Sequence, residues 1–174
     1  MGKEIEQTAL SRGHEIILKI DINNKNSFDN DILIKADVAI EFTNPENAVN
    51  NIIKCFHASL PIVVGTTGWY GKYDEVCKEC LALNASVLTA TNFSIGVNLF
   101  FEMNRRLAEL MKGKNYDVNI EETHHIRKLD APSGTAITTA EDIIKWGDKK
   151  KVWTKETPTS EHFLQVKCHR LDEV

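Results

Sequence analysis

The feature that most constrains this chain is an alternation of short apolar runs and helical patterns in its first half. Compact apolar runs at 37–42, 61–64 and 86–90 are typical of strands that are covered on both faces. A helix that begins at Asn44-Pro45 and another over Tyr73–Asn84 separate them. The alternation predicts βαβ units, and therefore an α/β fold with a parallel sheet and helices on both faces.

Two further elements are predicted before this alternation. Apolar residues share one face of a helix over Lys3–Arg12, and a β-branched run at His14–Ile20 predicts a strand that ends at Asp21. Parallel sheets bind ligands at the edge where the carboxyl ends of their strands meet. Because Asp21, Phe42-Thr43 and the loop Gly65–Gly68 each follow a predicted strand, we expect them at that edge.

The pattern changes after Asn92, where longer elements replace the short alternation. The predicted elements are helices over Val97–Met111 and Thr135–Trp146 and strands over Asp117–Glu122 and Phe163–Cys168. We interpret this part as a smaller α+β domain, with domains over 1–94 and 95–174. The triple lysine Lys149-Lys150-Lys151 is expected to be a solvated loop.

Composition excludes several classes of protein. The 174 residues are 42% hydrophobic and 26% charged, which is ordinary for a globular chain that can build a core without disulfides. A net charge of −4 offers no basic surface for nucleic acid and little attraction to anionic lipid. No apolar run is long enough to cross a membrane, and the N-terminus lacks a signal-peptide pattern, so we expect a cytoplasmic location.

The cysteines and histidines give no metal signature. Cys77-x-x-Cys80 would need a second ligand pair to bind zinc, which Cys55 and Cys168 do not supply, so we expect reduced thiols. The adjacent histidines at 124–125 diverge on a strand, and the chain has no His-Glu-x-x-His helix. We therefore expect no metal site.

The densest group of chemically active residues lies at 121–136. On a strand, His124 and His125 point to opposite faces, so we expect them to have different roles. Ser133-Gly134-Thr135 begins a helix, whose unpaired N–H groups and dipole favour an anion. The natural ligand is a small carboxylate or phosphate, with a histidine or Lys128 to supply a proton. A histidine pair alone is more often structural, and Ser133 lacks a Gly-x-Ser-x-Gly frame, so the whole stretch carries this interpretation.

The stretch Glu122-x-His-His-x-x-Lys-x-Asp-Ala-Pro-Ser-Gly-Thr-Ala136 resembles the signature of the dihydrodipicolinate reductase family, also called 4-hydroxy-tetrahydrodipicolinate reductases. Three further motifs agree in order, namely Glu41-Phe42-Thr43-x-Pro45, Gly65-Thr66-Thr67-Gly68 and Asn92-Phe93-Ser94-x-Gly96-Val97-Asn98. The resemblance covers nearly the whole chain. It implies a Rossmann-like cofactor domain, a substrate domain that also builds a homotetramer, and NADH or NADPH as reductant. The implied reaction yields tetrahydrodipicolinate in diaminopimelate and lysine biosynthesis.

The resemblance also implies a role for individual residues. His124 resembles the catalytic acid/base and Lys128 the proton donor for a small cyclic dicarboxylate imine. The implied substrate-binding residues are His125, Ser133, Gly134 and Thr135. The implied cofactor-binding residues are Phe42, Gly65, Thr66, Thr67, Asn92 and Phe93, together with Asp21.

Asp21 bears on the choice between the two nucleotides. A carboxylate there would accept hydrogen bonds from the adenosine ribose and repel a 2′-phosphate, which slightly favours NADH. The nearby cations Lys19 and Lys25 act in the opposite direction.

The chain departs from the family pattern at both ends. The family begins with a strand and a Gly-x-x-Gly-x-Met-Gly loop, whereas this chain starts at Met1-Gly2, and the family continues beyond Val174. We therefore expect a truncated form. One alternative is a non-catalytic fragment or binding module that keeps the substrate pocket. Another is a different Rossmann reductase of amino-acid metabolism, similar to homoserine dehydrogenase, against which the His-His-x-x-Lys motif argues.

Overall fold

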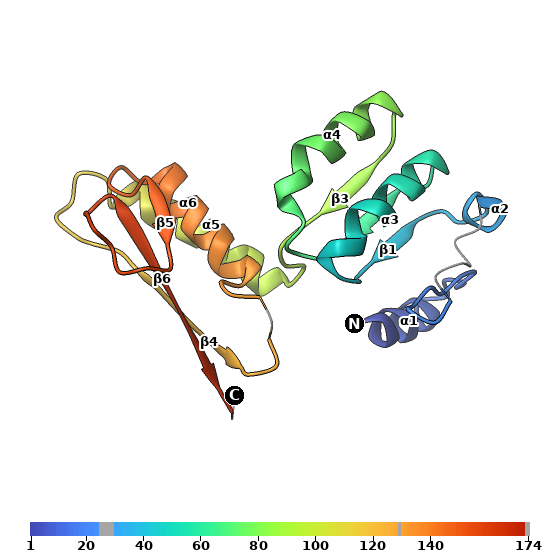
Figure 1. Ribbon diagram of the computed structural model, residues 1–174, viewed down its shortest axis with the longest axis horizontal. Coiled ribbons are helices and arrows are strands. Elements are labelled where there is room, and N and C mark those ends of the chain that lie inside the picture. Colours follow the sequence, from blue (N-terminus) through green and yellow to red (C-terminus); the bar gives the residue numbers. More distant parts are fainter. Residues whose placement is uncertain (25–29, 129, 173–174) are drawn as a thin grey trace. The chain divides into compact units, whose positions relative to one another are not determined.

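The chain forms two compact units, Met1–Ala90 and Thr91–Val174, in a computed structural model that describes residues 1–24, 30–128 and 130–172 (Figure 1). Within the described ranges, each unit contains a sheet of three parallel strands with helices packed on it. The α/β class predicted from the alternation is therefore confirmed. Lys25 lies outside the described residues.

The first unit builds its sheet from the predicted alternation. Its elements are α1 (Gly2–Ser11), α2 (Asn30–Leu33), β1 (Ala39–Glu41), α3 (Pro45–His57), β2 (Ile62–Val64), the 3₁₀ helix η2 (Tyr70–Lys72), α4 (Tyr73–Ala82) and β3 (Val87–Thr89). The strand order is β1-β2-β3, with Ala39, Ile62 and Val87 in register. The strands predicted at 37–42, 61–64 and 86–90 are confirmed in shorter form.

The strand predicted at His14–Ile20 is wrong. The segment forms no strand, and Asp21 lies in a turn, where its N–H donates to Asn24 Oδ1 (2.6 Å) and its Oδ1 accepts from the Asn23 N–H (2.7 Å). Asp and Asn side chains stabilise such turns by bonding to nearby backbone. A strand also needs a neighbour for its backbone groups, and in the described ranges β1 pairs only with β2. β-branched residues without a pairing partner do not make a strand.

Helix α3 begins where the sequence supplies both a cap and a proline. The Asn44 side chain accepts a hydrogen bond from the Asn47 N–H (3.0 Å), and Pro45 occupies the first turn. An N-cap of this kind satisfies a backbone donor that the helix itself leaves unpaired, and proline costs nothing there because its missing N–H has no intrahelical partner. The start of α3 is therefore fixed close to the carboxyl end of β1.

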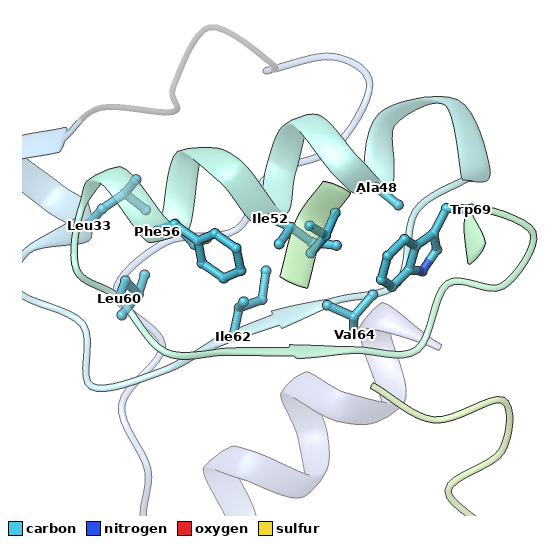
Figure 2. Close-up of a cluster of buried hydrophobic side chains, with 10 residues drawn as sticks. Leu33, Ala48, Ile52, Phe56, Leu60, Ile62, Val64 and Trp69 are labelled. Carbon is cyan, nitrogen blue, oxygen red and sulfur yellow. The ribbon is translucent and has the colours of Figure 1, made fainter. Parts of the chain in front are cut away.

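The apolar face of α3 packs on the sheet to form the core of this unit. Ile52 and Phe56 point from the helix toward Ile62 and Val64 of β2 (Figure 2). The buried cluster comprises Leu33, Ala48, Ile52, Cys55, Phe56, Leu60, Ile62, Val64, Trp69 and Val76. Burial, and secondarily the charge of Glu41, raises the pKa of the Cys55 thiol to about 11, so this cysteine behaves as a core residue.

The opposite face of the same sheet is less covered. Ile40, Val63 and Leu88 lie in register on that face, where Ile40 is 51% and Leu88 59% exposed. The prediction of helices on both faces therefore holds, for the residues described, only on the side of α3 and α4.

Close packing and hydrogen bonds join the carboxyl ends of β1 and β2. The Gly65 N–H donates to the Glu41 carbonyl (2.8 Å), and the Thr43 N–H donates to Thr66 Oγ1 (2.8 Å). A Cβ added at Gly65 would lie 2.1 Å from the Phe42 ring, well inside van der Waals contact. Glycine is therefore required at 65 while the Phe42 ring keeps this place.

The second unit stacks a parallel sheet and two helices. Its elements are α5 (Ile95–Leu110), β4 (Ile120–His125), α6 (Gly134–Trp146), β5 (Val152–Thr154) and β6 (Phe163–Leu171). The strand order is β4-β6-β5, and α6 packs on the sheet through Ala136, Ala140, Ile143, Leu164 and Val166. The predicted helices are confirmed. The strand predicted at 117–122 instead covers 120–125, which puts both adjacent histidines inside it, and β5 was not predicted.

Lys150 corrects the expectation of a solvated lysine loop. Its side chain is buried, and its Nζ donates to the carbonyls of Glu161 (2.9 Å) and Phe163 (2.9 Å) and pairs with Asp117 Oδ1 (2.7 Å). Three acceptors satisfy the three donors of an ammonium group, which is what its burial requires. The hydrogen bond from Lys150 also holds the pKa of Asp117 below its ordinary value. A run of lysines in sequence does not reveal such partners.

The described residues offer neither a membrane span nor a metal cluster. They contain no helix that is both long and apolar enough to span a membrane. They also contain no cluster of three or more His, Cys, Asp or Glu side chains arranged to hold a metal ion.

Truncating the centre of the first core should destabilise the protein strongly. Phe56 is 2% exposed, and we expect Phe56→Ala to lower the free energy of unfolding by about 3–5 kcal/mol. Leu81→Ala is the matched control, because Leu81 is 82% exposed and its loss should change the value by less than about 0.5 kcal/mol. Urea denaturation followed by circular dichroism measures both. Equal effects of the two changes would contradict this core.

The Phe42–Gly65 contact should appear as a clash when a methyl group is added. We expect Gly65→Ala to cost about 1–3 kcal/mol of stability, whereas Gly71→Ala, with no atom within 4 Å of the new Cβ, should be close to neutral. Adding Phe42→Ala to Gly65→Ala should remove part of the cost, so that the double change costs less than the sum of the single changes. Additive effects would show that the ring does not cover Gly65.

Candidate active site

Strand β4 gives its two adjacent histidines different surroundings. His124 is half-buried on the same face as Ile120 and Glu122, the face on which α6 packs. His125 is exposed on the opposite face, beside a cavity of about 390 Å³ lined by His125, Ile126, Arg127 and Asp172. The alternation expected of a strand is thus observed.

Lys128 is held by a carboxylate in the loop after β4. The loop begins with a turn in which the Lys128 N–H donates to the His125 carbonyl (3.1 Å). The Lys128 ammonium donates to both oxygens of Asp130 (2.7 and 2.9 Å). Burial acts to raise the pKa of Asp130, but the hydrogen bond and charge of Lys128 outweigh it and leave that pKa lowered. The ammonium is therefore paired with an ionised carboxylate.

Arg170 is a residue that the sequence reasoning missed. It lies in register with His124 on the neighbouring strand β6. Its Nε donates to the Lys128 carbonyl (3.2 Å), and its Nη2 donates to the Asp130 carbonyl (2.5 Å). These bonds fix the backbone on either side of residue 129. The signal was available, because continuing the alternation of the last strand beyond Cys168 places Arg170 on the inner face.

The start of α6 joins strand β4 through Ser133. The Ser133 side chain caps the helix by accepting from the Ala136 N–H (3.1 Å), and its own N–H donates to Glu122 Oε1 (2.9 Å). Burial acts to raise the pKa of Glu122, but the hydrogen bonds from Ser133 outweigh it, so the pKa of Glu122 is lowered. The N–H groups of Gly134 and Thr135 precede the first hydrogen bond inside the helix, which makes them donors for an anion.

Asn92 reaches this helix start from the segment before α5. The Asn92 Oδ1 accepts from the Ser94 N–H (2.8 Å), and its Nδ2 donates to Thr135 Oγ1 (3.4 Å). A predicted cofactor residue and a predicted substrate residue therefore lie side by side. The neighbouring ring of Phe93 is substantially exposed.

In the first unit, the predicted cofactor residues gather at the ends of β1 and β2. Phe42 covers Gly65, and Thr66 is buried with its hydroxyl bonded to the Thr43 N–H, so its side chain supports the loop. Thr67 follows and is half-buried. An edge made of backbone and an aromatic ring, at the carboxyl ends of parallel strands, suits the flat ring of a nucleotide cofactor. Asp21 bonds with Asn23 and Asn24 of its own turn.

Comparison with known proteins places both units in one family. Residues 1–93 match the family description "Dihydrodipicolinate reductase, N-terminus", and residues 96–174 match "Dihydrodipicolinate reductase, C-terminus". A 4-hydroxy-tetrahydrodipicolinate reductase of Christiangramia forsetii is 46% identical over 154 residues, covering 88% of this chain and 64% of that protein. One of Neisseria meningitidis serogroup A is 37% identical over 141 residues, covering 79% of this chain and 50% of that protein.

A solved structure gives the same result. The structure described as dipicolinate-bound dihydrodipicolinate reductase from Paenisporosarcina sp. TG-14 matches 95% of this chain and 64% of that chain, with a TM-score of 0.58 and 26% identity. The chain thus spans about half to two thirds of the length of these relatives. The resemblance read from the motifs is confirmed, and the alternative of another Rossmann reductase is set aside. With both units matched, the chain belongs to the dihydrodipicolinate reductase family.

Proposed function

We propose that this protein reduces 4-hydroxy-tetrahydrodipicolinate to tetrahydrodipicolinate with NADH or NADPH, in diaminopimelate and lysine biosynthesis. The observation that carries the proposal is the arrangement in the second unit. There Glu122 accepts a hydrogen bond from the N–H of Ser133, the cap of α6, and lies beside the half-buried His124. This arrangement supports a proton-transfer role for His124 next to a helix start that can bind an anion. The names of the matched relatives support the same reaction.

The proposed substrate class follows from the hydrogen-bond donors of the second unit. The N–H groups of Gly134 and Thr135, which precede the first hydrogen bond inside α6, suit one carboxylate. His125 is proposed as a further substrate contact from the family resemblance alone, because it lies on the other face of β4, where Arg127 and Asp172, of opposite charge, line the cavity beside it. Ser133 supports this site by capping the helix. A solved relative is described as bound to dipicolinate, which is a cyclic dicarboxylate. A small cyclic dicarboxylate is therefore the proposed ligand.

Two groups are proposed to move the proton. His124 acts as acid/base, since its Nδ1 is buried 3.7 Å from Glu122 Oε2 while its side chain remains 32% exposed. Lys128 acts as proton donor, and its pairing with Asp130 holds the ammonium in place. When bound, the nicotinamide supplies a hydride, and the residues proposed to hold the nucleotide are Phe42, Gly65, Thr66, Thr67, Asn92 and Phe93.

We also propose a homo-oligomer, a tetramer as in the family, located in the cytoplasm. Large apolar side chains are exposed along one helix of the second unit. They are Ile95, Leu99, Phe100, Met103, Leu107 and Leu110 of α5. A contiguous apolar surface of this kind is typical of protein contacts.

Removing either proposed proton-transfer group should lower kcat. We expect His124→Ala and Lys128→Ala each to reduce kcat by about 10²–10⁴-fold, because general acid catalysis stabilises the transition state more than the bound substrate. The measurement is oxidation of NADH or NADPH with enzymatically generated substrate, in this chain and in a version extended to the length of the relatives. His57→Ala and Lys78→Ala, both exposed in the first unit, are the matched controls. A folded His124→Ala with unchanged kcat would remove His124 from the chemistry.

Asp21 is proposed to favour NADH. Of the two cations that opposed this prediction, Lys19 pairs with Glu6 (2.7 Å) and Lys25 lies outside the described residues. We expect Asp21→Asn to raise the KM for NADH by more than the KM for NADPH, because a 2′-phosphate no longer meets a negative charge. Asp37→Asn, at the amino end of β1, is the control. Equal effects on both nucleotides would show that Asp21 does not face the ribose.

A further inference from the structure

Two buried polar atoms face each other on the inner face of β4. Glu122 Oε2 lies 3.7 Å from His124 Nδ1, with side chains 10% and 32% exposed respectively. Both atoms are buried, and among the residues that the structure describes neither has a hydrogen-bond partner. Because 3.7 Å exceeds hydrogen-bond distance, no hydrogen bond joins the two atoms, and a small rotation of the ring would close one. The exposed part of the His124 ring therefore lies away from Nδ1.

The proton on the imidazole decides whether this contact is favourable. The pKa of Glu122 is lowered, and its other oxygen already accepts from the Ser133 N–H (2.9 Å), so at neutral pH Oε2 can only accept. If Nδ1 carried no proton, two lone pairs would face each other inside the protein and both would stay unsatisfied. If Nδ1 carries the proton, one hydrogen bond satisfies both atoms. The second state is favoured.

The other groups near this pair are weaker donors or are already paired. Cys168, in register with Glu122, is a weak donor whose pKa is raised by burial and then by its hydrogen bond and charge interaction with Glu122, and its thiol also lies 3.9 Å from the Val166 carbonyl. Both oxygens of Asp130 accept from Lys128. The guanidinium of Arg170 donates to backbone carbonyls. A thiol is a weak donor, so the imidazole of His124 is the stronger donor available to Glu122 Oε2.

We propose that Glu122 is a positioning residue that holds His124 in the Nδ1–H tautomer, leaving Nε2 as the atom that exchanges a proton with the ligand. The same carboxylate orients the start of α6 through Ser133, so it aligns the proton-transfer group with the anion-binding N–H groups. A histidine commonly has its reactive nitrogen set by the bond that the other nitrogen makes. The role of Nε2 rests on the proposed function, whereas the tautomer does not.

The tautomer can be read without substrate or cofactor. Two-bond ¹H–¹⁵N correlation spectra of the ¹⁵N-labelled chain, at about two pH units above the usual histidine pKa, distinguish Nδ1–H from Nε2–H rings. The chain has 6 histidines, and the signals of one ring disappear in His124→Gln, which assigns it. We expect the Nδ1–H form in the unchanged chain. An Nε2–H ring there overturns the proposal without any variant at Glu122, so a variant that fails to fold does not leave it undecided.

Glu122→Gln should reverse the tautomer. The amide oxygen can keep the bond from Ser133, which places the NH₂ group against Nδ1 and forces that nitrogen to accept, so the ring should switch to Nε2–H. The control is Glu121→Gln on the opposite face of β4, which pairs with His169 Nε2 (2.9 Å). It should change only the His169 signals. An unchanged His124 tautomer in folded Glu122→Gln overturns the proposal.

Activity supplies a second measurement that separates the two proposals. In a form with reductase activity, Glu122→Gln should lower kcat at least about tenfold, because in the other tautomer Nε2 and Nδ1 exchange their donor and acceptor roles. Glu121→Gln should leave kcat unchanged. Absence of reductase activity in every form would contradict the proposed function and leave the tautomer result standing. A folded Glu122→Gln with switched tautomer and full kcat would overturn the role given to Nε2.

Discussion

The hydrogen bond from the Ser133 N–H to Glu122 is the interaction on which the second unit depends. It joins the middle of β4 to Ser133, the N-cap of α6, across the polar loop that separates the two elements. The loop is further held by Arg170, which reaches from β6 to the carbonyls of Lys128 and Asp130. Together these bonds place a histidine, an ammonium and free helix donors on a rigid frame. Sites of this kind are more exact when regular elements carry them than when loops do.

In the first unit, packing and hydrogen bonds hold the carboxyl ends of β1 and β2 together. The ends of β1 and β2 meet through the Thr43–Thr66 hydrogen bond and through the Phe42 ring, which occupies the space that a side chain at 65 would need. The Trp69 indole then donates to the Thr66 carbonyl (2.9 Å), so the loop after β2 is bonded on both sides. A nucleotide approaching this edge would meet backbone that is already ordered. Little conformational entropy would then be lost on binding.

The sequence predicted those features that depend on local pattern. The helix starts at Asn44-Pro45 and Ser133-Gly134, the strands of the first sheet and the divergence of the histidines at 124–125 all follow from period and residue type. The failures depend on pairing between distant segments. The run at 14–20 has strand composition but no strand, and Lys150 is buried because carbonyls 11 and 13 residues away accept from it. Arg170 was missed for the same reason, since its partners lie about 40 residues earlier in the chain.

Both units place a glutamate with one buried carboxylate oxygen on a strand, and this common feature connects the fold to the proposed function. Glu41 accepts from the Thr43 N–H and hydroxyl, directly before the cap of α3, and Glu122 accepts from Ser133, the cap of α6. In each case one carboxylate oxygen supports the start of the next helix, while the other is buried without a hydrogen-bond partner among the described residues. Burying an acceptor in this way is unfavourable unless something nearby can donate to it. At Glu41 the group whose pKa responds to the carboxylate is the buried Cys55 thiol, a weak donor, whereas at Glu122 the imidazole of His124 lies 3.7 Å away. The two glutamates therefore share a structural role, and the positioning role is proposed for Glu122 because its neighbour is an imidazole.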